Sequence, residues 1–83
     1  MNGSENPNQD QFNLDQTICI LVNGQSLSIQ PNTTLEKLLV DLKINSPAIA
    51  VELNREIQSR ETFANTKLKM DDNLEIVTLV GGG

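Results

Sequence analysis

The residues with the clearest chemical meaning are the three glycines at the end of the sequence, Gly81, Gly82 and Gly83. Because glycine has no side chain, such a segment can enter a narrow channel and adopt backbone angles that other residues avoid. The group that it offers for reaction is the terminal carboxylate of Gly83. We therefore predict that the tail is a substrate, in which Gly83 is modified and Gly81 and Gly82 are the spacer inside a partner's channel.

A carboxylate is a poor electrophile because its negative charge and its resonance repel nucleophiles. Adenylation with ATP converts a carboxylate to an acyl-adenylate, which has a good leaving group. The sequence has no glycine-rich phosphate loop followed by a helix, so a partner enzyme must carry out this activation. We expect a co-substrate of other enzymes that binds no cofactor itself.

Other residues that often perform chemistry are scarce. The sequence has no histidine, which excludes an imidazole metal site and a histidine-based catalytic triad. Cys19 has no Lys or Arg near it in the sequence to stabilise a thiolate, so we predict a structural cysteine. Asp71 and Asp72 lack calcium-loop spacing and are predicted to be solvated, and no metal site is expected. Arg55 and Arg60 either remain solvated or pair with acidic groups of a partner.

The composition indicates one small domain. The chain has 83 residues and a net charge of −5. Residues 1–16 are rich in Asn and Gln and are predicted to be a disordered extension, residues 17–80 form the domain, and residues 81–83 are a flexible tail. The acidic balance argues against nucleic acid and suits a protein partner with a basic surface. No apolar run reaches the roughly 20 residues of a membrane span, and the single cysteine fits a cytoplasmic protein.

The first half of the domain predicts a hairpin followed by a helix. Residues 18–22 and 25–30 read as strands, and Asn23-Gly24 between them suits a two-residue turn with positive φ at both positions. Thr33 and Glu36 match a capping box, which places a helix start there. Leucines at helical spacing form one apolar stripe, and the helix is expected to end near Lys43. The leucines of this stripe are Leu35, Leu38, Leu39 and Leu42.

The second half predicts further strands. Residues 48–53 read as a strand, Ile57 belongs to a short edge strand, residues 59–66 are irregular with Phe63 in the core, and residues 74–80 form the last strand. The first and last strands are apolar on both faces, as expected of central neighbours. This is an α+β fold in which one main helix covers one face of a mixed sheet of four or five strands.

A sheet covered on one face leaves its other face open. We expect Leu21 to point outward there, together with alternate residues of the last strand, and Leu21, Leu79 and Val80 are the candidate docking residues. Such an exposed apolar patch is typical of a docking surface for protein partners.

Taken together, these segments resemble the ubiquitin-like β-grasp sulfur carriers, and in particular the ThiS-type carriers of thiamine biosynthesis. The resemblance covers residues 18–83, although these carriers usually have Gly-Asp in the turn where this chain has Asp71-Asp72-Asn73. The segments that carry it are Leu21-Val22-Asn23-Gly24, Thr34-Leu35-Glu36-Lys37-Leu38-Leu39, Ala50-Val51-Glu52-Leu53-Asn54-Arg55-Glu56-Ile57 with Ser59-Arg60, and Leu74-Glu75-Ile76-Val77 before the glycines.

The resemblance implies a defined set of partners. A ThiF-type adenylyltransferase uses ATP on the carboxylate of Gly83, and a cysteine desulfurase or other sulfur donor converts it to a thiocarboxylate. A ThiG-type thiazole synthase then takes the sulfur for the thiazole ring of thiamine. Two alternatives stay open, a sulfur carrier for molybdopterin synthesis and a ubiquitin-like protein modifier. Molybdopterin carriers commonly have proline shortly before the glycines, whereas this chain has Thr78-Leu79-Val80.

Overall fold

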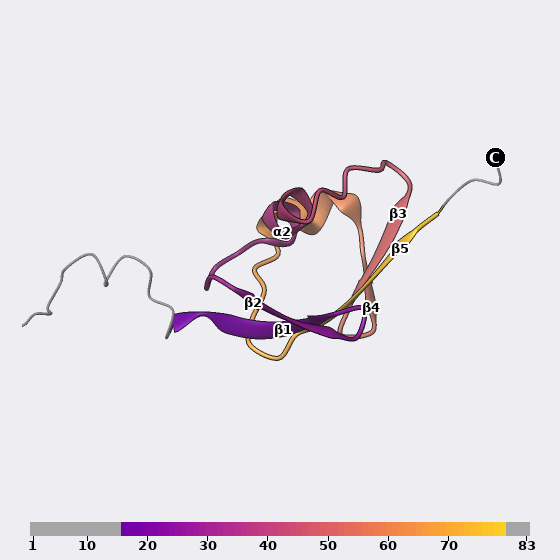
Figure 1. The fold of residues 1–83 in the computed structure, drawn as a ribbon. Coiled ribbons are helices and arrows are strands. Elements are labelled where there is room, and N and C mark those ends of the chain that lie inside the picture. The colour runs from indigo at the N-terminus through magenta and orange to yellow at the C-terminus, as the bar shows by residue number, and fades with distance from the viewer. Residues whose placement is uncertain (1–15, 80–83) are drawn as a thin grey trace, which may run out of the picture.

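The computed structural model describes residues 16–79, which form a five-stranded mixed sheet with helix α2 on one face (Figure 1). The strands are β1 (Ile18–Val22), β2 (Gln25–Ile29), β3 (Ile49–Leu53), β4 (Glu56–Gln58) and β5 (Asn73–Thr78). Helix α2 spans Leu35–Asp41, and a 3₁₀ helix, η2, spans Arg60–Asn65. The predicted α+β fold with one main helix over a mixed sheet is confirmed.

Strand β5 lies at the centre of the sheet, in the order β2-β1-β5-β3-β4. It pairs in parallel with β1 and antiparallel with β3. The expectation that the first and last strands are central neighbours is therefore confirmed. Parallel neighbours need a long crossover connection, and the helix and strands between β1 and β5 provide it.

Both tight turns of the sheet contain consecutive residues with positive φ. Asn23 and Gly24 have φ of 51° and 86°, as predicted for the first hairpin, and Asn54 and Arg55 have φ of 52° and 73°. Asparagine and glycine tolerate this region better than other residues. The two turns give their hairpins the twist of the sheet that they extend.

Helix α2 begins one residue later than predicted. The cap is Thr34, whose Oγ1 accepts a hydrogen bond from the backbone N–H of Lys37 at 3.1 Å. Thr33 instead donates its hydroxyl to the carbonyl of Gln30 at 2.6 Å. The predicted capping box of Thr33 and Glu36 is therefore wrong, because the turn after β2 uses the hydroxyl of Thr33 and leaves Thr34 to cap the helix.

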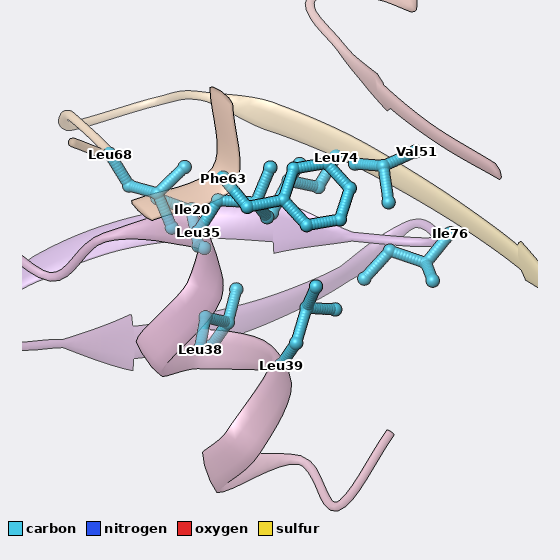
Figure 2. Packing of buried hydrophobic residues seen from close by; sticks show 9 residues of the cluster. All are labelled: Ile20, Leu35, Leu38, Leu39, Val51, Phe63, Leu68, Leu74 and Ile76. Carbon is cyan, nitrogen blue, oxygen red and sulfur yellow. The ribbon is translucent and has the colours of Figure 1, made fainter. Parts of the chain in front are cut away.

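The core lies between α2, η2 and the covered face of the sheet. Figure 2 shows Leu38 and Leu39 pointing from the helix toward the strands, with the ring of Phe63 beside them. Leu42, predicted in the same stripe, is 36% exposed because it follows the end of the helix as its C-cap. The buried residues are Ile20, Leu35, Leu38, Leu39, Val51, Phe63, Leu68, Leu74 and Ile76.

Residues 59–66 are more regular than predicted, since most of them form η2. The prediction that Phe63 lies in the core is confirmed. Arg60 lies over the ring of Phe63, with its guanidinium carbon 5.8 Å from the ring centroid, and donates a hydrogen bond to the carbonyl of Pro47 at 2.7 Å. Arg60 therefore links η2 to the loop before β3. The sequence analysis considered solvation or pairing with a partner for Arg60, and not this structural role.

Asp72 is a buried structural carboxylate, which corrects the prediction that both acids of this turn are solvated. Its side chain is 6% exposed and accepts hydrogen bonds from the backbone N–H of Lys69 at 2.7 Å and from Nδ2 of Asn54 at 3.0 Å. The side chain of Asn54 also accepts from the backbone N–H of Asn73 at 2.9 Å. Asp72 and Asn54 thus join the β3–β4 turn to the start of β5, whereas Asp71 is exposed.

Asn23 fixes the other side of β5. Its Oδ1 accepts from the backbone N–H of Ile76 at 2.7 Å, and its Nδ2 donates to the carbonyl of Ile76 at 3.1 Å. Its backbone N–H also donates to the carbonyl of Leu74 at 2.8 Å. The side chain therefore extends the pairing of β1 with β5 beyond the last residue of β1.

The substitution Asp72→Asn should lower the free energy of unfolding by about 1–2 kcal/mol, because an amide has one acceptor oxygen for two donors. Asp71→Asn is the matched control, since Asn tolerates the φ of 71° at that position, and it should change stability by less than about 0.5 kcal/mol. Urea denaturation measures both values. Equal stability of the two variants would contradict the assigned role of Asp72.

The substitution Asn23→Gly keeps a residue that accepts positive φ but removes both side-chain bonds to Ile76. We expect a loss of about 1 kcal/mol or more in unfolding free energy and faster amide exchange at Ile76. Asn32→Gly is the control, because Asn32 also has positive φ, at 69°, and its side chain makes no hydrogen bond to another described residue. NMR hydrogen exchange measures the effect, and unchanged protection at Ile76 would argue against it.

Candidate functional site

The structure holds strand β5 to the sheet almost up to the glycine tail. Thr78 pairs with Ile49, and the backbone N–H of Leu79 donates to the carbonyl of Ala48 at 2.6 Å. Residues 80–83 lie outside the described residues, and with them the predicted docking residue Val80 and the glycines. The predictions for Gly81, Gly82 and Gly83 therefore stay predictions. Four residues can span at most about 14 Å when fully extended.

The sheet face opposite α2 carries exposed apolar side chains. Leu21 is 38% exposed and Leu79 is 53% exposed, so both predicted docking residues in the described range are accessible. The register adds Val77 and Ile57, which are 53% and 69% exposed. In the strand register, Leu21 of β1 is the partner of Asn73 in β5. Ile57 of β4 is the partner of Glu52 in β3, which is in turn the partner of Glu75 in β5. Since Asn73, Glu75 and Val77 alternate along β5, these side chains share one face, which we call the open face.

Val77 and Ile57 were missed as candidate docking residues. The alternation of β5 places Val77 on the same side as Leu79, so the signal for Val77 was present in the sequence. The position of Ile57 depends on the register of β4 against β3, in which Ile57 is level with Glu52. A short strand of three residues does not fix that register by its own pattern.

A shallow hollow of about 490 Å³ lies on the open face over β3, β4 and β5. Ala50, Ile57 and Val77 give it an apolar part, while Glu52 and Glu75 give it an acidic part. Arg55, for which solvation and pairing with a partner were both left open, also lines it. The hollow is adjacent to the strand that leads into the tail, so a partner that covers it also meets the residues that precede the glycines.

Cys19 lies on the same face, and its thiol is free and exposed. Its backbone N–H donates to Sδ of Met70 at 3.3 Å. The sequence interpretation placed it as a structural residue, but it does not contribute to the buried cluster. Strand alternation explains this, because Ile20 occupies the covered face and its neighbour must point the other way.

The described residues contain no group of three or more His, Cys, Asp or Glu side chains that could hold a metal ion. Within residues 16–79, no helix has the length and apolar character of a membrane span. The described part of the chain thus presents an open sheet face with exposed apolar side chains, and a central strand that is hydrogen-bonded up to Leu79.

Comparisons with known proteins agree with this arrangement. The sequence model of the ThiS family matches residues 8–83. The sulfur carrier protein ThiS of Bacillus subtilis is 33% identical over 63 residues, which cover 75% of this chain and 96% of that protein. The crystal structure of the thiamine biosynthesis protein ThiS from Geobacter metallireducens superposes with a TM-score of 0.67 at 32% identity, covering 80% of this chain and 100% of that one.

A further relative is much longer than this chain. A thiazole synthase of Magnetococcus marinus is 39% identical over 64 residues, which cover 77% of this chain but 20% of that protein. The chain therefore spans about a fifth of the length of this relative.

The fold, the length of the family match and the solved structure all lead to one assignment. The five-stranded sheet with its single main helix is a β-grasp fold, and the chain belongs to the ThiS family of sulfur carrier proteins.

Proposed function

We propose that this carrier transports sulfur as a thiocarboxylate on Gly83 and donates it to thiazole formation in thiamine biosynthesis. The observation that supports this proposal most directly is the path of β5, which is held at the centre of the sheet up to Leu79 and then continues into the glycines. Because β5 is hydrogen-bonded up to Leu79, an enzyme can bind the residues that follow it without unfolding the domain. The single cysteine of the sequence fits a cytoplasmic location.

The proposed reaction begins with an oxygen of the Gly83 carboxylate. That oxygen attacks the α-phosphorus of ATP, pyrophosphate leaves, and an acyl-adenylate forms. A persulfide sulfur of the donor then attacks the acyl carbon and AMP leaves, which gives an acyl disulfide. A thiol cleaves the S–S bond, so the donor leaves as a disulfide and Gly83 keeps one sulfur as a thiocarboxylate.

The chain itself contributes the carboxylate that reacts and the folded domain to which the partners bind, and partner enzymes contribute the catalysis. We propose a ThiF-type adenylyltransferase for the ATP-dependent step, with a cysteine desulfurase or another persulfide protein as sulfur donor. For the final acceptor we propose a thiazole synthase. The Magnetococcus marinus relative supports this choice, because a segment similar to this chain forms part of a protein of that name.

The residues before the glycines favour the thiamine pathway over molybdopterin synthesis, since Thr78, Leu79 and Val80 include no proline. A carrier for molybdopterin synthesis would pass the same sulfur to a different acceptor. A protein modifier would instead leave its C-terminus on a lysine of another protein.

Incubation of the full chain with its adenylyltransferase, ATP, a persulfide donor and a thiol should replace one oxygen of Gly83 by sulfur. Intact mass spectrometry detects the exchange, and fragmentation places it on the last residue. The chain without Gly83 should remain unmodified, while its thermal stability stays within about 0.5 kcal/mol of the parent. No mass change with the complete set of cognate enzymes would exclude the carrier reaction, and isopeptide adducts would identify a modifier.

The substitution Leu21→Ser should weaken binding to the partner enzymes about tenfold or more, because it removes apolar area that the partner covers. The control is Val40→Ser, which removes an exposed apolar side chain from α2, on the opposite side of the molecule. Isothermal titration calorimetry gives both dissociation constants. Equal binding by the two variants would mean that the open face is not the docking surface.

A further inference from the structure

Two glutamates face each other on the open face. Glu52 of β3 and Glu75 of β5 are directly opposed in the antiparallel register. Side chains in such a pair have Cβ atoms about 5 Å apart, and like charges in this position destabilise a sheet. The neighbouring pair along the ladder is Ala50 with Val77, and the register matches Val51 with Ile76 on the covered face. Glu52 with Glu75 is therefore the one pair of charged residues that face each other in the ladder of β3 with β5.

No described residue forms an ion pair with either glutamate. The ion pair within residues 16–79 joins Lys37 and Asp41 on α2, with 2.8 Å between Nζ and Oδ1. Arg55 lines the same hollow as the two glutamates, but no ion pair links it to either of them. The negative charges thus remain available to a group from outside the described part of the chain.

The surroundings of the pair limit what that group can be. The hollow of about 490 Å³ holds both carboxylates together with Ile57 and Val77, and Leu21 lies on the same face across β5. An apolar surface with an acidic centre suits a protein surface that carries a basic side chain within apolar neighbours. Two carboxylates alone fall short of a metal site, and no larger cluster occurs in residues 16–79.

We propose that Glu52 and Glu75 form an acidic socket that selects the thiazole synthase, which inserts one arginine or lysine side chain between the two carboxylates. Its apolar residues cover Leu21, Ile57 and Val77 around the socket. This inference rests on the proposed function and specifies its partner. The socket lies on the strand that leads to the tail, and Glu75 precedes Leu79 by about 13 Å of extended chain, so one partner surface can hold both.

The choice of the synthase rests on chain continuity, and the charge of this chain favours a basic side chain on the partner. The net charge of −5 attracts a basic partner. In the Magnetococcus marinus relative, a segment similar to this chain lies within a protein named thiazole synthase, so the two sequences share one polypeptide there. A basic group between the carboxylates would turn an unfavourable pair in the free protein into a favourable one in the complex.

The test measures the stability of the free protein and its affinity for the synthase. The inference predicts that the same substitution raises the stability and lowers the affinity. Glu75→Gln and Glu52→Gln each remove one of the repelling charges, so each should raise the Tm of the free protein by about 2 °C or more. Each should also weaken binding to the thiazole synthase of the same organism by about tenfold. Calorimetry at low and at high salt should give a smaller salt dependence for the variants than for the parent.

The control is Glu56→Gln, which removes the same charge from β4. Glu56 is exposed and pairs with Leu53, so its side chain belongs to the other face of the sheet. This variant should bind the synthase with an affinity within about twofold of the parent. If Glu56→Gln weakens binding as much as Glu75→Gln does, the loss of affinity comes from the change in net charge, and the proposed socket is wrong.

Other outcomes separate this inference from the proposed function. Glu75→Gln with parental affinity for the synthase would overturn the socket, even if Gly83 still acquires sulfur. If Glu75→Gln weakens binding to the adenylyltransferase but not to the synthase, the synthase is not the protein that occupies the socket. Failure of the parent to bind the synthase would overturn the inference as well. Absence of the thiocarboxylate in the mass spectrum would instead reject the proposed function.

Discussion

The hydrogen bonding of β5 on both sides is the constraint on which the rest of the structure depends. On one side the backbone N–H of Leu21 donates to the carbonyl of Asp72 at 2.9 Å, and the side chain of Asn23 continues the pairing to Ile76. On the other side β3 pairs with β5 from Leu74 to Thr78. The two hairpins flank this strand in the sheet, α2 and η2 cover one face of the sheet, and in the sequence the strand precedes the glycines.

The two faces of the sheet serve different purposes. The covered face supplies the stability, because Ile20, Val51 and Leu74 are fully buried against α2 and η2. The open face keeps apolar and acidic side chains at the surface, where they add little to the fold. An opposed pair of glutamates is tolerated there because the covered face stabilises the domain independently of it. Recognition by a partner can therefore change without repacking of the core.

Much of the fold followed from local patterns. Asn23-Gly24 predicted its turn, and the spacing of Leu35, Leu38 and Leu39 predicted the covered face of α2, because short-range sterics and periodicity decide such features. Features that depend on distant neighbours were not predictable in this way. Thr34 rather than Thr33 caps the helix because Gln30 takes the hydroxyl of Thr33.

The same limit applied to the site. The exposure of Leu21 and Leu79 followed from a sheet covered on one side. The burial of Asp72 requires Asn54 from another hairpin, and the opposition of Glu52 and Glu75 requires the register of two strands that lie far apart in sequence. No local pattern contains these pairings. The glycines lie outside the described residues, so the role predicted for them stays a prediction.

The hydrogen bond from Leu79 to Ala48 also has a mechanical consequence. Under the proposed function, a partner enzyme that binds the glycines in a channel would pull along the axis of β5. Such a load acts in shear on the ladders to β1 and β3 together, so many bonds must yield at once instead of one after another. A tail on an edge strand would peel from the sheet under the same pull. The central position of β5 thus makes the domain a mechanical anchor that can be held by its end and released intact.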